Sequence, residues 1–243
     1  MTVPHILSEI ISEDVTLNLI EPDIYSVFPI GDSPAAYDRM GASTIYDMVA
    51  CNRFYNQLMW GYSIKDYAAF CEDTLTSFGE GWVLDLACGS LAFTAKIYAN
   101  FSNRPLVFLD QSLKLLRKGK SRLGKLKGKI LENMFFLQAD ALQLPFKSNI
   151  FNTIISLNLL HCLGPDDAKT ALKEIKRVLA YNGNSAITTL VQSSRRSNRY
   201  LKMLAGLGAL VSRSPDELLS AFNDINMQVT QNIKGNLAFI RYR

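Results

Sequence analysis

Short, continuous runs of apolar residues alternate with amphipathic stretches from about residue 82 onward. The runs are 82–86, 106–109, 134–138, 152–157 and 185–191. Apolar residues at helical spacing occupy the stretches between them, for example 112–123 and 166–180. Strands buried on both faces are continuously apolar, and intervening helices cover the two faces of a parallel sheet. The pattern predicts an α/β fold.

The end of the chain has a different pattern. Segments 228–233 and 236–241 are separated by two residues that include Gly235, which is typical of an antiparallel hairpin at a sheet edge. With the five runs above, the expected sheet has seven strands, most of them parallel.

Two regions precede the first run. Residues 1–40 are expected to form an arm, in which one helical face of apolar residues is followed by a segment broken by Pro22, Pro29 and Pro34. Residues 42–78 have helical spacing and many aromatic side chains. We therefore divide the chain into the arm and one domain, 41–243.

Composition adds limits to this picture. The chain is 48% apolar and 20% charged, which is ordinary for a globular protein. No uninterrupted apolar run approaches the roughly 18–20 residues that span a bilayer, and no Lys or Arg precedes Arg39, so neither a membrane span nor a secretory signal is predicted. Four scattered cysteines without a CxxC pair indicate reduced thiols, and hence a cytoplasmic protein.

Charge is distributed unevenly. Residues 1–38 contain seven acids and no Lys or Arg, whereas 114–129 contain eight basic residues and no acid, and 195–213 are also basic. Such runs are usually solvated faces, but they could also attract an anionic or carrier-linked small molecule. The acidic arm is expected to dock on the basic part of the same subunit or of a partner, as in a homodimer. No interleaved aromatic residues accompany the lysines, so nucleic acid is not favoured.

Candidate chemistry lies just after the strands, where doubly wound sheets bind ligands. The first run leads into Asp85, Ala87 and Gly89, whose small residues allow a ligand close to the backbone. The turn lacks the GxGxxG pattern because position 91 is Leu, which disfavours a nicotinamide cofactor. The second run ends at Asp110, 25 residues after Asp85, where an acid can hold both ribose hydroxyls of a nucleoside.

The third and fourth runs end in further polar residues. Asp140 can accept a hydrogen bond from an exocyclic amine while the N–H of Ala141 donates to a ring nitrogen, a pairing that reads adenine. The fourth run leads to Asn158 and then to His161, the only histidine outside the arm.

The segments VLDLACGSLAFT, VFLDQS, FLQADALQLPF and FNTIISLNLLHCL, followed by EIKRVLAYNG, together resemble the ordered motifs of the class I S-adenosylmethionine-dependent methyltransferases over about residues 82–190. Within this family the segments resemble in particular the broad methyltransferase type 11 group, which includes the ubiquinone and menaquinone biosynthesis enzymes. The resemblance implies a Rossmann-like fold, S-adenosylmethionine as methyl donor and S-adenosylhomocysteine as product. It also implies that 42–78 form a helical lid and that a substrate cap lies within 192–215.

The resemblance assigns roles to the residues after the strands. Asp85, Ala87 and Gly89 would lie by the methionine part, Asp110 by the ribose, and Gln111, Asp140 and Ala141 by the adenine, with Asn158 also at the cofactor. Two departures stand out. Leu91 replaces a usual glycine and is expected to narrow the space near the cofactor, and 180–183 replace a Lys-Pro-Gly-Gly turn.

His161 is the candidate catalytic residue. Methyl transfer to a neutral hydroxyl or amine requires removal of a proton, and histidine is the usual base near pH 7. Substrate orientation and a structural role remain alternatives for His161. Candidate substrate contacts are Tyr46, Trp60, Tyr62, Arg195, Arg196 and Arg199. With two histidines and no ligand spacing, no metal site is predicted.

The sequence therefore predicts an enzyme that transfers a methyl group from S-adenosylmethionine to a small molecule, with O-, N- and C-methylation all open. Two alternatives remain. One is an RNA or protein methyltransferase, and the other is a methyltransferase-like protein that binds the cofactor in a cyclase or regulatory role.

Overall fold

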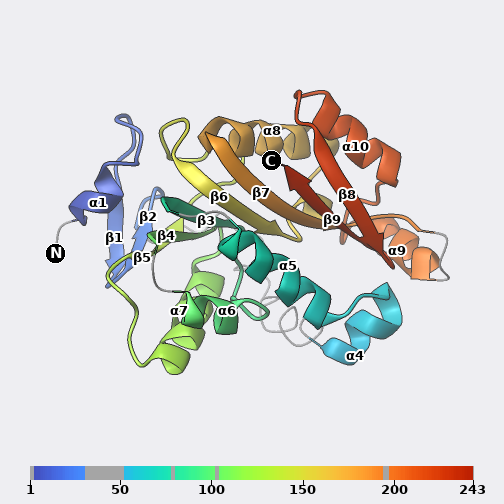
Figure 1. Cartoon of the computed structure of the whole chain (residues 1–243), viewed down its shortest axis with the longest axis horizontal. Helices are drawn as coiled ribbons and strands as arrows, with labels where there is room; N and C mark the ends of the chain where they lie inside the picture. Colours follow the sequence, from blue (N-terminus) through green and yellow to red (C-terminus); the bar gives the residue numbers. More distant parts are fainter. Residues whose placement is uncertain (1–2, 31–51, 78–79, 102–103, 194–196, 243) are drawn as a thin grey trace.

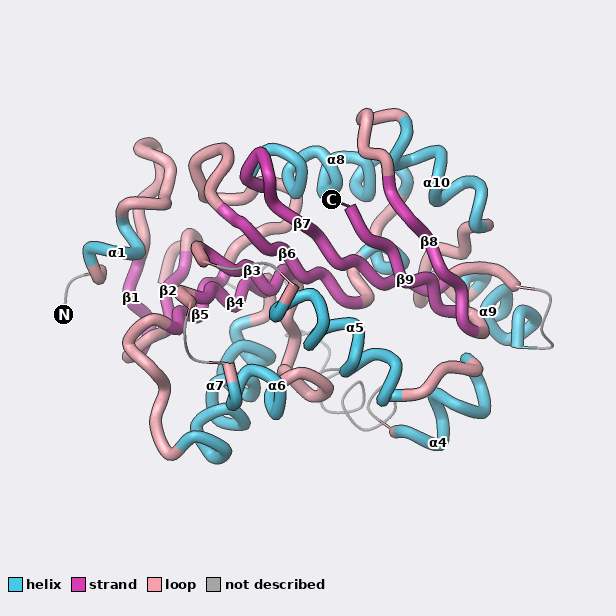
Figure 2. The backbone as a smooth tube through the Cα atoms, in the orientation of Figure 1, coloured by secondary structure: helices cyan, strands magenta, loops and turns pink. Residues whose placement is uncertain are grey.

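The computed structural model describes residues 3–30, 52–77, 80–101, 104–193 and 197–242. One sheet runs through the molecule, with α-helices on both faces (Figures 1 and 2). Among the described residues the sheet has nine strands, in the spatial order β1, β2, β5, β4, β3, β6, β7, β9 and β8. The strands from β2 to β7 are parallel to their neighbours, whereas β1, β9 and β8 pair antiparallel.

The strand bounds follow the apolar runs closely. The strands are β1 Asn18–Glu21, β2 Ile24–Ser26, β3 Trp82–Leu86, β4 Leu106–Asp110, β5 Met134–Gln138, β6 Phe151–Leu157, β7 Leu179–Leu190, β8 Val229–Lys234 and β9 Leu237–Tyr242. The five predicted parallel strands and the C-terminal hairpin are confirmed, each to within a few residues except at the start of β7.

Helices flank this sheet on two sides. They are α1 His5–Ser8, α4 Arg53–Tyr55, α5 Ile64–Thr76, α6 Ala95–Asn100, α7 Leu113–Lys127, α8 Pro165–Val178, α9 Ser197–Gly206 and α10 Pro215–Asn223, with a π-helix η1 at Asn56–Trp60 and a 3-10 turn η2 at Leu160–Cys162. Helices α8 and α10 pack on one face, and α5, α6 and α7 pack on the other. Alternate strand residues feed the two layers: Leu84 and Leu86 face α8, whereas Val83 faces α6 and α7.

The strand count differs from the expected seven because the arm supplies two strands. β1 and β2 form a hairpin, and β2 pairs parallel with β5, with Tyr25 opposite Leu137. Pro22, which by itself suggests a break in regular structure, instead lies in the turn that connects these two short strands. Residues 3–30 are thus part of the main sheet and core, not a separate arm.

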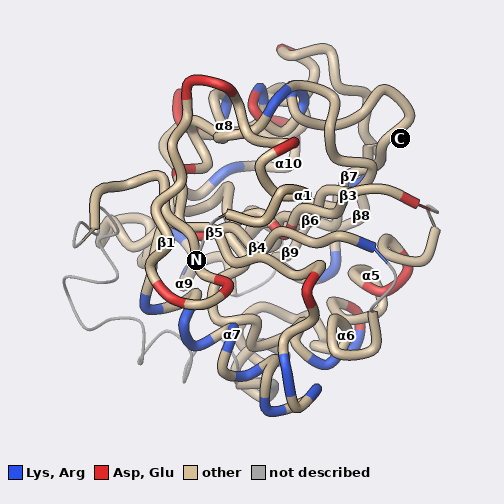
Figure 3. Tube along the Cα trace, turned by 90° about the vertical axis from the view of Figure 1, so that its left-hand side faces the viewer, with Lys and Arg blue, Asp and Glu red and all other residues tan. Residues whose placement is uncertain are grey.

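Acidic residues of this N-terminal segment contact basic residues of α7 in the same subunit, as the charge pattern predicts. Arg117 contacts Glu21 at 2.5 Å, and Lys120 lies 3.5 Å from Asp23. Figure 3 shows the basic residues gathered along α7. Other basic residues of 114–129 also serve the fold: Arg122 donates to Ser90 Oγ at 2.9 Å, and Lys127 donates to the carbonyl of Ala99 at 2.7 Å. The expected dimer through the arm stays a prediction.

The predicted turn at 180–183 is wrong, because β7 already begins at Leu179. Gly183 does not have a positive φ. What requires glycine there is close approach: a Cβ would lie 2.8 Å from Leu179 Cδ1 and 2.9 Å from the carbonyl oxygen of Phe151. The register between β6 and β7 shifts at this point, which accommodates the extra residues of β7.

Candidate active site

The order in which successive strands are added to the sheet reverses at β3: β4 and β5 lie on one side of it, and β6 and β7 lie on the other. Beyond the carboxyl end of β3, residues 85–94 enclose a pocket of about 50 Å³ together with residues from α5 and the end of β6. In this turn Ala87 (φ +57°), Gly89 (φ +57°) and Leu91 (φ +53°) all have left-handed backbone conformations. A Cβ on Gly89 would meet nothing within 4 Å, so the backbone here is open to a ligand.

Asp85 lies at the bottom of this pocket. Its side chain is buried, and Oδ2 has no hydrogen-bond partner among the residues the structure describes. Burial raises the pKa of Asp85 to about 7, the Tyr98 hydroxyl lowers it, and the Asp110 carboxylate raises it further. A buried acceptor without a donor is costly, so Asp85 is suited to receive a donor or a cation from a ligand.

Asp110, at the end of β4, is oriented by two backbone amides. Gly89 N donates to Oδ2 at 2.8 Å, and Ser112 N donates to Oδ1 at 2.8 Å. Each carboxylate oxygen accepts more than one hydrogen bond, so Asp110 keeps acceptor capacity for a diol. The structure therefore places Asp85, Gly89 and Asp110 together, as predicted from the sequence.

The predicted nucleobase contacts also lie together. Gln111 Nε2 is 3.4 Å from Asp140 Oδ2, and Leu142 N donates to Asp140 Oδ1 at 2.9 Å. Gln138 holds Gln111 from below, because its Nε2 donates to the Gln111 carbonyl at 3.1 Å. Ala141 follows Asp140 at the end of this row.

Asn158, at the end of β6 with φ +68°, lines the pocket from the other side. Its Nδ2 donates to the Tyr67 hydroxyl at 2.9 Å, which links the strand to helix α5. Tyr67 and Phe93 both line the pocket, and their rings are 5.1 Å apart. Neither residue was a site candidate, because Tyr67 is one aromatic among many in 42–78 and the residues alone do not say which one faces the strand ends.

His161 lies in η2 and is 8% exposed. Leu190 N is 3.4 Å from Nδ1, and Thr189 Oγ1 is 3.3 Å from the same atom. Burial and then the charge of Arg213 lower the pKa of His161 to about 4, so its imidazole is neutral and weakly basic at pH 7. His161 is not among the residues that line the pocket. This environment suits a hydrogen-bonded structural residue better than a proton acceptor.

The candidate substrate contacts are divided. Trp60 and Tyr62 are each 5% exposed and belong to an aromatic cluster between α5, α9 and the sheet. Neither lines the pocket itself, although the Tyr62 ring stacks on the ring of Tyr67, which does, with the centroids 6.2 Å apart. Packing in this cluster accounts for their burial. Arg199 is an exposed residue of α9. Tyr46, Arg195 and Arg196 lie outside the described residues.

Leu91 does not block the turn. Its backbone keeps the left-handed shape that the usual glycine would have, and its side chain is 1% exposed. The side chain points toward α7, where its Cγ is 3.2 Å from the position of a Cβ on Gly119. A glycine on the facing helix therefore makes room for Leu91, and the expected narrowing is in part relieved.

The described ranges contain no group of three or more His, Cys, Asp or Glu side chains arranged to hold a metal ion. No helix within these ranges is long and apolar enough to cross a bilayer.

Comparison with known proteins agrees with this geometry. Residues 83–183, which contain the turn after β3 and the residues after β4, β5 and β6, match the methyltransferase domain family. The chain is also 31% identical over 156 residues to the ubiquinone/menaquinone biosynthesis C-methyltransferase UbiE of Shewanella frigidimarina, covering 61% of each protein. The match thus spans about three fifths of that relative.

Solved structures share the fold at low identity. The geranyl diphosphate C-methyltransferase of Streptomyces coelicolor superposes with a TM-score of 0.58 at 13% identity, over 73% of this chain and 74% of the other. A methyltransferase of Haloferax volcanii, solved in complex with the Trm112 activator, gives 0.59 at 14% identity over 85% and 95%. Motifs, fold and family match agree, and together they support a class I S-adenosylmethionine-dependent methyltransferase.

Proposed function

We propose that this protein transfers a methyl group from S-adenosylmethionine to a small-molecule acceptor. The observation that carries the proposal is the buried, unpartnered Oδ2 of Asp85 in a pocket beside the oriented carboxylate of Asp110. Acceptors placed in this way at the end of two neighbouring strands fit an amino-acid ammonium group and a ribose diol on one ligand. S-adenosylmethionine has both groups.

The residues present fit this cofactor from end to end. The pocket is formed by the turn after β3 around Asp85, so it would receive the methionine end, with Asp85 facing the ammonium group. Asp110 would hold the ribose. Gln111, Asp140 and the N–H of Ala141 would hold the adenine edge, and Asn158 would close the opposite wall.

The cofactor supplies an electrophilic methyl group on a sulfonium. The chain's own contribution is to bind and orient: Asp85 and Asp110 fix the two ends of the donor, and the Tyr67–Asn158 contact closes the site from α5. Holding donor and acceptor in line contributes much of the rate of such a transfer.

We further propose a carbon nucleophile as acceptor. The name of the Shewanella relative, a C-methyltransferase, supports this. The buried, neutral His161 supports it too, because a stabilised carbanion needs no strong base at the moment of transfer. An anionic group on the acceptor would find the exposed guanidinium of Arg199 on α9.

Calorimetric titration with S-adenosylhomocysteine tests the first step of the proposal. Dissociation constants in the micromolar range, about −8 kcal/mol, are expected. Incubation with cofactor carrying a labelled methyl group and a panel of enol, phenol, amine and carboxylate acceptors then tests transfer. Binding without transfer to any of them would favour a cofactor-binding protein with a non-methylating role. Absence of binding would refute the proposal as a whole.

A further inference from the structure

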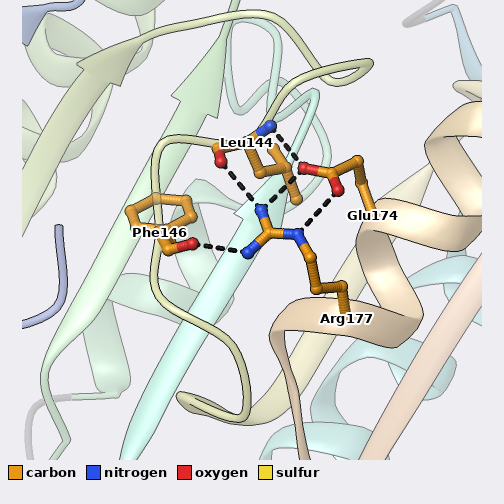
Figure 4. Close-up of polar contacts among 4 residues, drawn as sticks. All are labelled: Leu144, Phe146, Glu174 and Arg177. Carbon is orange, nitrogen blue, oxygen red and sulfur yellow. Dashed lines mark hydrogen bonds and ion pairs between the residues drawn. The ribbon is translucent and has the colours of Figure 1, made fainter. Parts of the chain in front are cut away.

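Helix α8 contacts the loop between β5 and β6 through one ion pair, whose two side chains bind the backbone of the loop. Glu174 accepts two hydrogen bonds from Arg177, from Nε at 2.7 Å to Oε1 and from Nη2 at 2.7 Å to Oε2. Arg177 also donates from Nη2 to the carbonyl of Leu144 at 2.9 Å and from Nη1 to that of Phe146 at 2.7 Å. Glu174 Oε2 in turn accepts from Leu144 N at 2.8 Å. Figure 4 shows these five contacts as one closed network.

The same loop is held from its other side by the N-terminal segment. Ser12 N donates to the carbonyl of Pro145 at 3.0 Å, and Lys147 N donates to that of Ile10 at 2.9 Å. Phe146, between these bonds, is fully buried. Residues 144–147 thus have almost no freedom to move relative to α8.

This fixed loop begins next to the expected nucleobase contacts. Leu142, whose N–H holds Asp140 Oδ1 at 2.9 Å, is two residues before Leu144. Asp140, Glu174 and Arg177 line one groove, of about 970 Å³. Because only residues 141–143 separate Asp140 from Leu144, a displacement of Leu144 would also displace Asp140.

We propose that Arg177 and Glu174 are positioning residues that fix Asp140 and Ala141 for recognition of the adenine edge of the cofactor. The proposal rests on the proposed function, because it concerns the nucleobase end of the same site. The planar guanidinium suits this task, since it serves a carboxylate and two carbonyls at once. A lysine has a single point of charge and cannot reproduce that fork.

Arg177→Lys tests the proposal with little loss of side-chain volume, and Glu174→Gln, which keeps an acceptor for Leu144 N, tests it from the other partner. Lys169→Gln is the matched control, because Lys169 also forms an ion pair from α8, to Asp224 at 2.9 Å, but away from this loop. Calorimetry on the folded full-length proteins would measure affinity for S-adenosylhomocysteine and for its inosine analogue, which lacks the exocyclic amine.

We expect Arg177→Lys to weaken S-adenosylhomocysteine binding by about tenfold or more, because a displaced Asp140 would lose its charge-assisted hydrogen bond to the adenine amine. It should also reduce the preference for adenine over inosine, while Lys169→Gln changes neither. A merely structural role would lower thermal stability but leave that preference intact, and this result would overturn the inference. If the unaltered protein binds neither ligand, the proposed function itself fails.

Discussion

The backbone N–H of Gly89 donates a hydrogen bond of 2.8 Å to the carboxylate of Asp110. This bond joins the turn after β3 to the end of the neighbouring strand β4, and its two residues are 21 positions apart along the chain. It orients Asp110, the candidate for ribose binding, relative to the turn after β3. Loss of Asp110 should therefore affect two parts of the site.

Asp110→Ala should weaken S-adenosylhomocysteine binding by roughly 100-fold, about 3 kcal/mol, because charge-assisted hydrogen bonds to the ligand are lost and the Gly89 amide loses its acceptor. Calorimetry on the folded variant measures the change. Glu132→Ala removes an exposed carboxylate elsewhere and serves as the control. Unchanged affinity in Asp110→Ala would remove Asp110 from the ribose role.

Binding should depend on pH through Asp85. Burial raises its pKa to about 7, and a bound ammonium group would stabilise the ionised form. Affinity for S-adenosylhomocysteine should then rise as pH increases from about 6 to 8, with release of a proton near pH 6–7. Calorimetry in two buffers of different ionisation enthalpy counts that proton. Asp85→Asn should bind more weakly and show no proton release.

The raised pKa of Asp85 has the opposite effect on the stability of the ligand-free protein, which should decrease as pH rises. The ordinary pKa of aspartic acid in an unfolded chain is about 3.9. Between about pH 4 and 7 the folded state binds more protons than the unfolded state, so the free energy of unfolding decreases as pH rises through this window. Asp85→Asn should flatten that part of the pH–stability curve in urea titrations. A curve unchanged by the substitution would show that Asp85 titrates normally.

Much of the fold could be predicted from the sequence, because buried parallel strands are continuous apolar runs. β3 and β5 were predicted with the bounds that the structure has. The grouping of Asp85, Asp110 and Asp140 followed from their positions at or just beyond the carboxyl ends of β3, β4 and β5, since parallel strands present these ends at one edge.

What the sequence did not reveal depends on contacts between distant segments. The strands β1 and β2 are only four and three residues long, and their apolar residues are too few for a periodic signal. Tyr67 is one of several aromatic residues in α4, η1 and α5, and only the packing of α5 on β6 brings it to Asn158. The room that Gly119 gives to Leu91 depends on the packing of α7 against the turn after β3.

His161 should matter more for stability than for turnover. His161→Ala removes the acceptor near the buried N–H of Leu190, and the free energy of unfolding should fall by about 1–3 kcal/mol. His161→Asn keeps an acceptor near the position of Nδ1 and should lose less. Urea unfolding and turnover of labelled cofactor measure the two effects separately. A loss of 10²–10⁴-fold in turnover with unchanged stability would instead restore the general base predicted from the sequence.

The pH dependence of His161 has a definite sign. Its pKa is lowered to about 4 by burial and by Arg213, whereas an unfolded chain has a pKa of about 6.5. Below about pH 6.5 the unfolded state gains a proton that the folded state does not, so stability falls as pH decreases toward 4. His161→Asn should remove this part of the acid sensitivity.

The N-terminal segment packs as part of the core. Leu7 is fully buried in the cluster that α8 and α10 share with the sheet, whereas its neighbour Ile6 is 41% exposed. Leu7→Ala should lower the free energy of unfolding by about 2–5 kcal/mol, the usual range for a buried leucine, because a cavity replaces side-chain contacts. Ile6→Ala is the matched control and should change stability by less than about 1 kcal/mol.

Chemical unfolding followed by circular dichroism compares the two variants under identical conditions. If the segment were a detachable arm, Leu7→Ala would unfold with the same midpoint as Ile6→Ala. Deletion of residues 1–29 would then leave a domain of unchanged stability. We expect neither result. β2 covers the edge of β5, with Ile24 opposite Phe136, and an exposed parallel edge invites aggregation. The truncated protein should therefore unfold more easily and associate, which light scattering detects.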